Sequence, residues 1–197
     1  MTYAFIQGGT RGIGLAMVRQ LLGTDPNMAV VATGRAAATC AALAQLERTY
    51  EGRLIAVNMD LASADSIKAA AAQIEAHTDT LDLIVNASGL LHSGDTIQPE
   101  KRLSSVDSAA LEAVFRVNAF GPLLVISQLL PLIPKKTRCV IANISARVGS
   151  IDDNRLGGWY AYRGSKAAQN MFTKTIAIEL ARDRAGAICV ALHPGTV

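Results

Sequence analysis

Tyr162 and Lys166 stand four residues apart in the segment Tyr162-Arg163-Gly164-Ser165-Lys166, within a stretch of helical periodicity. Side chains at this spacing share one face of a helix, so the ammonium is expected to lie close to the phenol. A phenol with a pKa of about 10 is a weak base at neutral pH. A nearby cation favours the phenolate and is expected to lower that pKa by roughly 1–3 units, which makes Tyr162 a candidate general acid/base. A surface pair without function is the alternative.

A second group of residues is suited to hold phosphate. The sequence Gln7-Gly8-Gly9-Thr10-Arg11-Gly12-Ile13-Gly14 follows an apolar run directly and opens a helical pattern. Glycine at these places permits a tight turn, lets backbone amides approach a pyrophosphate and allows close packing of helix on strand. The N-terminus of the following helix then offers unpaired N–H groups. No Gly-Lys-Ser/Thr follows, which excludes a P-loop; the alternative is an ordinary strand-to-helix turn.

The charges near this glycine turn bear on which dinucleotide would bind. The second predicted strand ends in Ala32-Thr33-Gly34-Arg35, and no acidic residue follows before Glu47. An acidic residue at this place would hydrogen-bond the ribose hydroxyls of NAD(H). The guanidinium groups of Arg35 and Arg11 instead suit the extra phosphate of NADP(H). We therefore expect NADP(H) to be favoured over NAD(H), unless both arginines are solvated surface residues.

Alternating strands and helices are expected to position these residues. Several short runs, such as Leu81-Asp82-Leu83-Ile84-Val85, are nearly continuous in apolar character, as strands of a covered parallel sheet are. The pattern predicts an α/β fold with a doubly wound parallel sheet of the Rossmann type and right-handed crossovers. The predicted strands are 3–6, 29–33, 54–58, 81–86, 138–144 and 187–192, and the predicted helices are 12–22, 37–50, 63–77, 107–133 (interrupted near Pro122) and 160–184.

The composition favours one globular domain. Of the 197 residues, 50% are hydrophobic and 18% are charged, and no linker or internal repeat divides the chain. We therefore expect residues 1–197 to form a single dinucleotide-binding domain. The formal net charge of +3 and the lack of a dense Lys/Arg run argue against nucleic acid or a membrane surface as a partner.

Neither a metal site nor a membrane segment is expected. Cys40, Cys139 and Cys189 are scattered without CxxC spacing, which indicates reduced thiols and no bound metal. The richest apolar stretch, 121–133, is broken by prolines and Gln128, and no basic segment with a long apolar run begins the chain. These features predict a cytoplasmic protein. The histidines are too dispersed for a triad or a metal site: they are His77, His92 and His193.

Taken together, the glycine turn and the Tyr-x-x-x-Lys pair resemble the short-chain dehydrogenase/reductase family over essentially the whole chain. Two departures from its pattern are Gln7, where the family usually has threonine, and Ser88, within its Asn-Asn-Ala-Gly element. Taken singly, the other matching residues are ordinary turn, strand-end or helix residues. Their order and their places on the expected elements carry the resemblance. These residues are Asp60 and Leu61 after the third predicted strand, Asn86-Ala87-Ser88-Gly89 after the fourth, Asn118 in the long helix, Ser145 after the fifth strand, and Pro194-Gly195 after the sixth.

The resemblance implies an oxidoreductase that reduces a small-molecule carbonyl, or oxidises the corresponding alcohol, by hydride transfer with NADP(H). Tyr162 would exchange the proton, Lys166 would lower its pKa and bind the nicotinamide ribose, and Ser145 would orient the carbonyl. Asn118 would hold a water in a proton relay. The implied cofactor-binding residues are Gly8, Thr10, Arg11, Gly12, Ile13, Gly14, Arg35, Asp60, Leu61, Asn86, Ala87, Ser88, Tyr162, Lys166, Pro194 and Gly195.

Within the family, the chain looks most like the C-factor-like branch, some members of which are linked to cell–cell signalling. A signalling protein that binds the dinucleotide with little or no turnover therefore stays open, as does an inactive fragment. The resemblance also implies strand order 3-2-1-4-5-6 and a homodimer or homotetramer. Because the sequence stops at Thr196-Val197, we expect a C-terminally truncated domain without the family's usual last strand.

Overall fold

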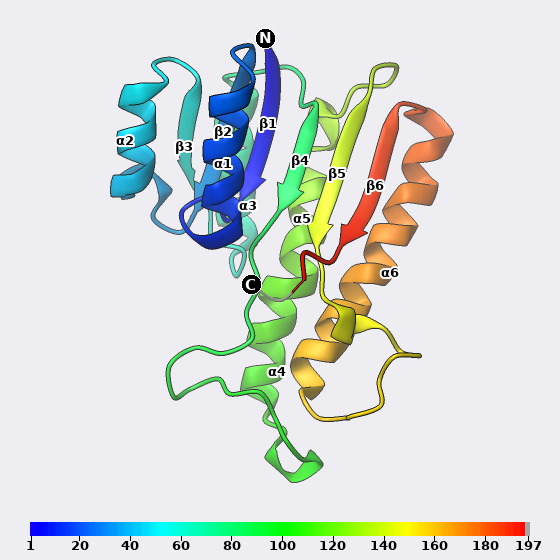
Figure 1. Ribbon diagram of the computed structural model, residues 1–197. Coiled ribbons are helices and arrows are strands. Elements are labelled where there is room, and N and C mark those ends of the chain that lie inside the picture. Colours follow the sequence, from blue (N-terminus) through cyan, green and yellow to red (C-terminus); the bar gives the residue numbers. More distant parts are fainter. Residues whose placement is uncertain (196–197) are drawn as a thin grey trace.

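Six parallel strands form one sheet in the computed structural model, which describes residues 1–195 of the chain (Figure 1). The order across the sheet is β3-β2-β1-β4-β5-β6, so the expected doubly wound topology is confirmed. In this topology the chain begins at the middle of the sheet, runs outward to one edge and then returns to build the other half. The strands are β1 (Thr2–Gln7), β2 (Met28–Gly34), β3 (Leu54–Asn58), β4 (Leu83–Asn86), β5 (Cys139–Ile144) and β6 (Ala187–Leu192).

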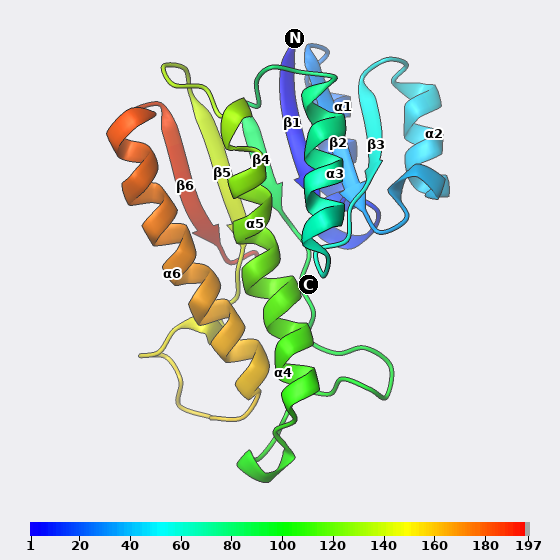
Figure 2. The ribbon, with the colours of Figure 1, turned by 180° about the vertical axis from the view of Figure 1, so that it is seen from behind.

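Helices cover both faces of the sheet, as Figures 1 and 2 show from opposite sides. Helices α1 (Gly12–Thr24) and α2 (Ala41–Thr49) lie on one face; α3 (Ala64–Glu75), α5 (Gly121–Gln128) and α6 (Tyr160–Asp183) lie on the other. Helix α4 (Ser108–Phe115) continues into α5 through a π-helical segment, η3 (Arg116–Phe120). Short 3-10 turns are η1 (Ala37–Thr39), η2 (Leu103–Ser105), η4 (Leu130–Leu132) and η5 (Arg147–Gly149).

Alternation along each strand divides the core between the two faces. In β1, Phe5 packs with the residues of α3 and α5, whereas Ile6 packs with those of α1 and α2. The same division recurs in β5 between Ile141 and Ala142. Because successive side chains of a strand point to opposite faces, both layers of helices bury apolar surface against the same strands.

The long crossover helix differs from the sequence expectation. Pro122 was expected to interrupt it, because proline lacks an N–H and its ring collides with the carbonyl four residues earlier. Instead the π turn of η3 precedes the proline, and Gly121 N–H bonds Arg116 O five residues back. This wider turn lets the helix pass through Pro122. The helix ends at Gln128, earlier than expected, and β4 begins at Leu83 rather than at residue 81.

This continuous helix also overturns the expectation that no segment has the length and apolarity to cross a membrane. Ser108–Gln128 passes that test by length and composition alone, with a mean hydropathy of 1.5 over its most apolar window. In this fold the segment is the crossover between β4 and β5, and it packs against α3 and α6 (Figure 2).

All six strands end at the same edge of the sheet, where three long segments meet. Figure 1 shows the segment between β4 and α4, the segment between β5 and α6, and the helix α4 extending beyond this edge. In open α/β sheets, ligands bind at the carboxyl ends of the strands, where the chain reverses its direction of winding. Here that reversal lies between β1 and β4.

Replacement of a core residue in β4 should measure how far the fold depends on this sheet. Ile84 is fully buried, so Ile84→Ala should lower the free energy of unfolding by about 2–5 kcal/mol through lost apolar burial and the cavity left behind. Ile151, on a loop and 85% exposed, provides the control: Ile151→Ala should change it by less than about 0.5 kcal/mol. Urea unfolding followed by circular dichroism would measure both, and equal losses would contradict the assigned core.

Candidate active site

The turn after β1 is held against β2 by its backbone. The amides of Gly8 and Gly9 both donate to the carbonyl of Thr33, each at 2.9 Å. Gly8 has a φ of 82°, in the left-handed region that favours glycine. A Cβ on Gly14 would overlap the Gly8 carbonyl, so α1 can approach the turn this closely only with glycine at that position.

The N-terminus of α1 has backbone N–H groups without an acceptor among residues 1–195. Its N-cap residue, Arg11, has extended backbone dihedrals, and its side chain caps none of the N–H groups of the first turn. These groups and the helix dipole favour an anion at this end. The helix begins directly at the glycine turn, so the turn and the helix end together fit a pyrophosphate.

A cleft of about 890 Å³ runs along the carboxyl edge from this turn. We call it the long cleft. Most of the residues predicted to bind the dinucleotide line this cleft: Gly8, Thr10, Arg11, Gly12, Ile13, Gly14, Arg35, Asp60, Leu61, Ala87 and Ser88. This volume lies within the range of roughly 300–1,000 Å³ that is typical of small-molecule and cofactor sites.

Three arginines surround the long cleft. Arg11 and Arg35 were expected there, and both are exposed without a salt bridge among residues 1–195. Arg116, in the π turn, was missed by the sequence analysis and lines the same cleft together with Glu112. A π turn inside a helix cannot be read from apolar periodicity, so nothing in the sequence signalled that Arg116 would face this way.

Asp60 has a local role as well as a place in the cleft. Its Oδ1 accepts a hydrogen bond from Ala62 N at 2.9 Å, which is the turn geometry expected of an aspartate after a strand. The two sequence interpretations of this residue, turn former and cofactor contact, are therefore compatible.

The two departures from the family pattern contact each other. Gln7 is buried, and its Oε1 accepts a hydrogen bond from Ser88 N at 3.2 Å. Gly8 leaves room for the Ser88 hydroxyl, which a Cβ on Gly8 would approach to 2.5 Å. Gln7 and Ser88 thus join the turn after β1 to the turn after β4.

A second cleft, of about 270 Å³, opens at the end of β5. We call it the small cleft. It shares Ile13, Ala87, Ser88 and Gly89 with the long cleft, so the two form one groove. The predicted site residues that line it are Ser145, Tyr162, Lys166, Pro194 and Gly195; His193, expected to be structural or solvated, lines it too.

Tyr162 and Lys166 lie on one face of α6, as expected. The Lys166 Nζ atom is 5.9 Å from the centroid of the Tyr162 ring. Lys166 is 2% exposed, and its Nζ donates to Ile144 O at 2.8 Å and to Gln169 Oε1 at 3.1 Å. Burial lowers the pKa of this ammonium to about 8.

The expected lowering of the Tyr162 pKa is wrong for this arrangement. Burial of the ring raises the pKa of Tyr162 above its ordinary value. Among residues 1–195, Lys166 Nζ donates to Ile144 O and Gln169 Oε1, and no hydrogen bond joins it to the phenol. The sequence could place the pair on one face but could not weigh its electrostatic effect against desolvation.

Ser145 lies at the end of β5 and is held by a residue that the sequence analysis missed. Its Oγ donates to Asn170 Oδ1 at 2.6 Å, and its backbone N–H donates to Leu192 O at 2.7 Å. Asn170 is four residues beyond Lys166 on the same helix face, which is the signal that could have identified it.

Two of the predicted site residues, Asn118 and Asn86, line neither the long cleft nor the small cleft. Asn118 Nδ2 donates to Leu90 O and Ser165 Oγ, and its Oδ1 accepts from Leu90 N at 2.6 Å. Asn86 is fully buried at the end of β4, and its Nδ2 donates to Asn143 Oδ1 at 2.8 Å. Their side chains thus hold the elements around the groove together.

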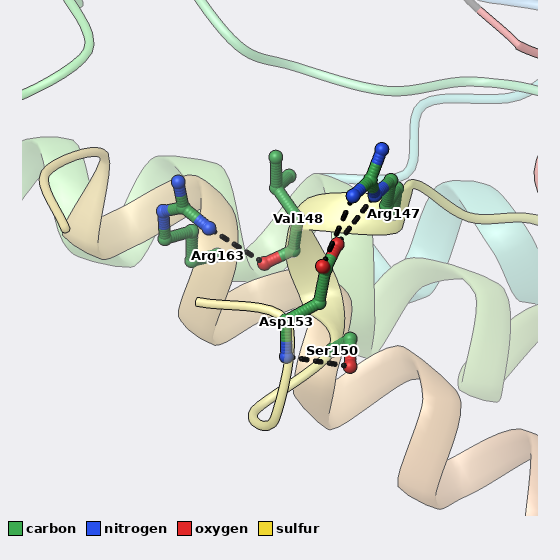
Figure 3. A network of polar contacts seen from close by, with 5 residues as sticks. All are labelled: Arg147, Val148, Ser150, Asp153 and Arg163. Carbon is green, nitrogen blue, oxygen red and sulfur yellow. Dashed lines mark hydrogen bonds and ion pairs between the residues drawn. The ribbon is translucent and has the colours of Figure 1, made fainter. Parts of the chain in front are cut away.

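Polar contacts fix the segment between β5 and α6 (Figure 3). Arg147 and Asp153 form an exposed ion pair, which lowers the pKa of the Asp153 carboxyl. Arg163, next to Tyr162, donates to Val148 O at 3.4 Å and to Gly158 O at 3.1 Å. Trp159, which follows Gly158, has a φ of 53°. Its ring packs edge-on against the Tyr162 ring, with the ring centroids 6.3 Å apart.

Comparison with known proteins agrees with this geometry. A family model described as short chain dehydrogenase matches residues 2–197. An uncharacterised oxidoreductase of Schizosaccharomyces pombe is 31% identical over 195 residues, which cover 98% of this chain and 72% of that protein. The C-signal protein of Myxococcus xanthus is 38% identical over 120 residues, covering 61% of this chain and 68% of its own, in line with the expected branch.

A solved structure shares the whole described architecture. NADPH-bound carbonyl reductase from chicken fatty liver superposes with a TM-score of 0.84 at 29% identity, covering 100% of this chain and 80% of its own. With the sheet order and the family match, this similarity shows that the chain belongs to the short-chain dehydrogenase/reductase family of nicotinamide-dependent oxidoreductases.

Proposed function

We propose that the protein reduces a small-molecule carbonyl, or oxidises the corresponding alcohol, with NADP(H) and with Tyr162 as general acid/base. The observation that carries this proposal is the shared lining of the small cleft: Ser145, Tyr162 and Lys166 face the same space as Ile13 of the glycine turn. A dinucleotide bound along the groove would bring its reactive ring to these three side chains.

The residues of the groove fit this cofactor. The glycine turn admits a pyrophosphate at the N-terminus of α1, and the groove is continuous from there to the small cleft. When bound, the nicotinamide supplies or accepts the hydride. Arg11, Arg35 and Arg116 would favour the additional phosphate of NADP(H) by charge-assisted hydrogen bonds. NADPH in the related chicken carbonyl reductase supports the same preference.

Tyr162 would move the proton. Burial raises the pKa of Tyr162, so the phenol keeps its proton at neutral pH and can donate it to a carbonyl oxygen, as reduction requires. Ser145 would orient that oxygen by donating its one hydroxyl proton, which would turn from Asn170 Oδ1 to the substrate. Asn118 would position Leu90 and Ser165 beside this pair.

Lys166 would supply positive charge next to the reacting oxygen. Its ammonium has three protons, and the one not bound by Ile144 or Gln169 is left for the small cleft and the nicotinamide ribose. Charge there stabilises negative charge that develops on the phenol or on the substrate.

The alternative is a signalling protein of the C-factor type that binds the dinucleotide with little turnover. The partial similarity to C-signal favours it, but a protein that only binds has no need of the complete Ser-Tyr-Lys set. We also propose a single cytoplasmic domain that does not bind nucleic acid or membranes, and a homodimer or homotetramer. Exposed apolar side chains on η3, α5 and α6 support the oligomer: Phe120, Leu124, Met171 and Ile178.

Removal of the Tyr162 hydroxyl should abolish turnover. Tyr162→Phe should lower kcat by roughly 10²–10⁴-fold because the proton donor is lost, while NADPH binding is retained. Tyr160→Phe is the matched control, since Tyr160 is exposed and lies outside the small cleft. Oxidation of NADPH with a panel of ketones and aldehydes would measure both variants, and full activity of Tyr162→Phe would rule out the proposed chemistry.

Reversal of the charge at Arg35 should change the cofactor preference. Arg35→Asp should weaken NADPH binding about 10- to 100-fold through loss of charge-assisted hydrogen bonds, and should affect NADH much less. Arg48→Asp makes the same charge change on α2, away from the long cleft, and should leave both affinities nearly unchanged. Calorimetric titration at fixed ionic strength would test this, and an unchanged NADPH:NADH ratio in Arg35→Asp would exclude the phosphate contact.

The burial of Lys166 should make stability depend on pH. Its pKa is about 8 in the folded protein against an ordinary value of 10.5. Between these two pKa values the unfolded chain retains a proton that the folded protein has released, so the free energy of unfolding rises with pH. Below about pH 8 both states carry the proton, and the full cost of burying the charge lowers stability. Relative to Lys166→Met, the gain from about pH 8 to about pH 10 should be about 2 kcal/mol. Urea unfolding across this range would measure it, and parallel curves for the two proteins would contradict the buried charge.

A further inference from the structure

Gln169 is a buried polar residue to which the proposed chemistry assigns no role. It lies on α6 three residues after Lys166, and 1% of its surface is exposed. Its Oε1 atom is one of the two acceptors of the Lys166 ammonium, at 3.1 Å; the other is the Ile144 carbonyl, at 2.8 Å. Gln169 is therefore the only side chain among residues 1–195 that hydrogen-bonds this ammonium.

The orientation of the Gln169 amide is set by Lys166. An ammonium can only donate, so the amide must present its oxygen to it. This leaves Gln169 Nε2 buried and without a hydrogen-bond partner among the described residues. An unpaired buried N–H group is costly; leucine, of similar size, would avoid it but would leave an N–H group of Lys166 without its acceptor. Packing alone therefore does not explain a glutamine at this position.

We propose that Gln169 is a positioning residue for Lys166: its amide oxygen keeps the buried ammonium charged and directs the remaining N–H into the small cleft. The importance of that charge for turnover rests on the proposed function. The contact itself does not, because it lies within the protein.

Among the described residues, few titratable groups share the small cleft with the Lys166 ammonium. Tyr162 on α6 and His193 after β6 line the small cleft with it. Two further residues lie near the ammonium: Gly89 in the turn after β4 and Asn118 in η3. A Cβ on Gly89 would lie 3.8 Å from both Asn118 Oδ1 and Lys166 Nζ. Neither Gly89 nor Asn118 titrates.

The segment after β5 adds no compensating charge. Its Arg147 and Asp153 pair with each other on the exposed side of that segment (Figure 3). Within residues 1–195 no carboxylate lies within 4.0 Å of Lys166 Nζ. Two neutral oxygens therefore oppose the effect of burial, which lowers the pKa to about 8, and Gln169 supplies one of them.

Titration of Lys166 in the folded protein tests this directly. Lysine labelled at Cε would be followed by NMR against pH, with the Lys166 signal assigned by its loss in Lys166→Arg. Gln169→Met, which removes the acceptor and keeps an unbranched side chain, should lower the titration midpoint by about one pH unit or more. Gln169→Glu, which adds negative charge, should raise it.

Thr173→Val is the control. Thr173 lies on the same face of α6 and is also buried; its hydroxyl accepts from Asn143 Nδ2 and donates to the Gln169 backbone carbonyl, but among the described residues it makes no hydrogen bond to Lys166. A midpoint unchanged by this variant and shifted in opposite directions by the two Gln169 variants supports the proposal. Wild-type midpoints in Gln169→Met and Gln169→Glu overturn it, and if Gln169→Met fails to fold, the direction of the shift in Gln169→Glu decides.

Activity gives a second readout that separates the two proposals. If the protein reduces carbonyls, the alkaline limb of its pH–rate profile should move with the Lys166 midpoint in each variant. A lower rate with the limbs of the profile at the same pH values as in the wild type would mean that Gln169 has a structural role only, and would overturn the positioning role. Shifted midpoints in a protein without turnover at any pH would support the role of Gln169 and overturn the proposed function.

Discussion

The hydrogen bond from Lys166 Nζ to the carbonyl of Ile144 joins the long helix α6 to the end of strand β5. It fixes which face of the helix meets the sheet edge, and Tyr162 follows because it lies one turn earlier on that face. Gly149 makes the approach possible, since a Cβ there would come within 2.8 Å of Lys166 Cβ. A buried charge with two acceptors thus sets the orientation of the whole small cleft.

The parallel sheet brings the other parts of the groove to the same edge. Strand β4 pairs with both β1 and β5, and its last residue, Asn86, stands opposite Gln7 and Asn143. The three turns that follow these strands are therefore neighbours, although they are far apart in the sequence. The lack of a Cβ on Gly14 then allows α1 to start beside them, and its first N–H groups have no acceptor within the part of the chain that the structure describes.

The order of the strands was implied by the family resemblance, whereas local patterns were sufficient to predict the alternation of strands and helices, the glycine turn and the common face of Tyr162 and Lys166. Each depends on periodicity or turn chemistry within a few residues. The remaining features depend on tertiary packing. Proline rules alone predicted a break at Pro122, but a π turn absorbs the clash and turns Arg116 toward the long cleft. The direction of the Tyr162 pKa shift is decided by burial, which residue spacing does not report.

The central claim is that Tyr162 and Lys166 face the reactive ring of a dinucleotide seated on the glycine turn. A crystal structure of the protein with bound NADP⁺ would test it most directly. We expect the pyrophosphate at the N-terminus of α1 and the nicotinamide in the small cleft, between Ile13 and Pro194, with the ribose within hydrogen-bond distance of Lys166 Nζ. A nicotinamide bound outside the small cleft, away from Tyr162, would contradict the claim.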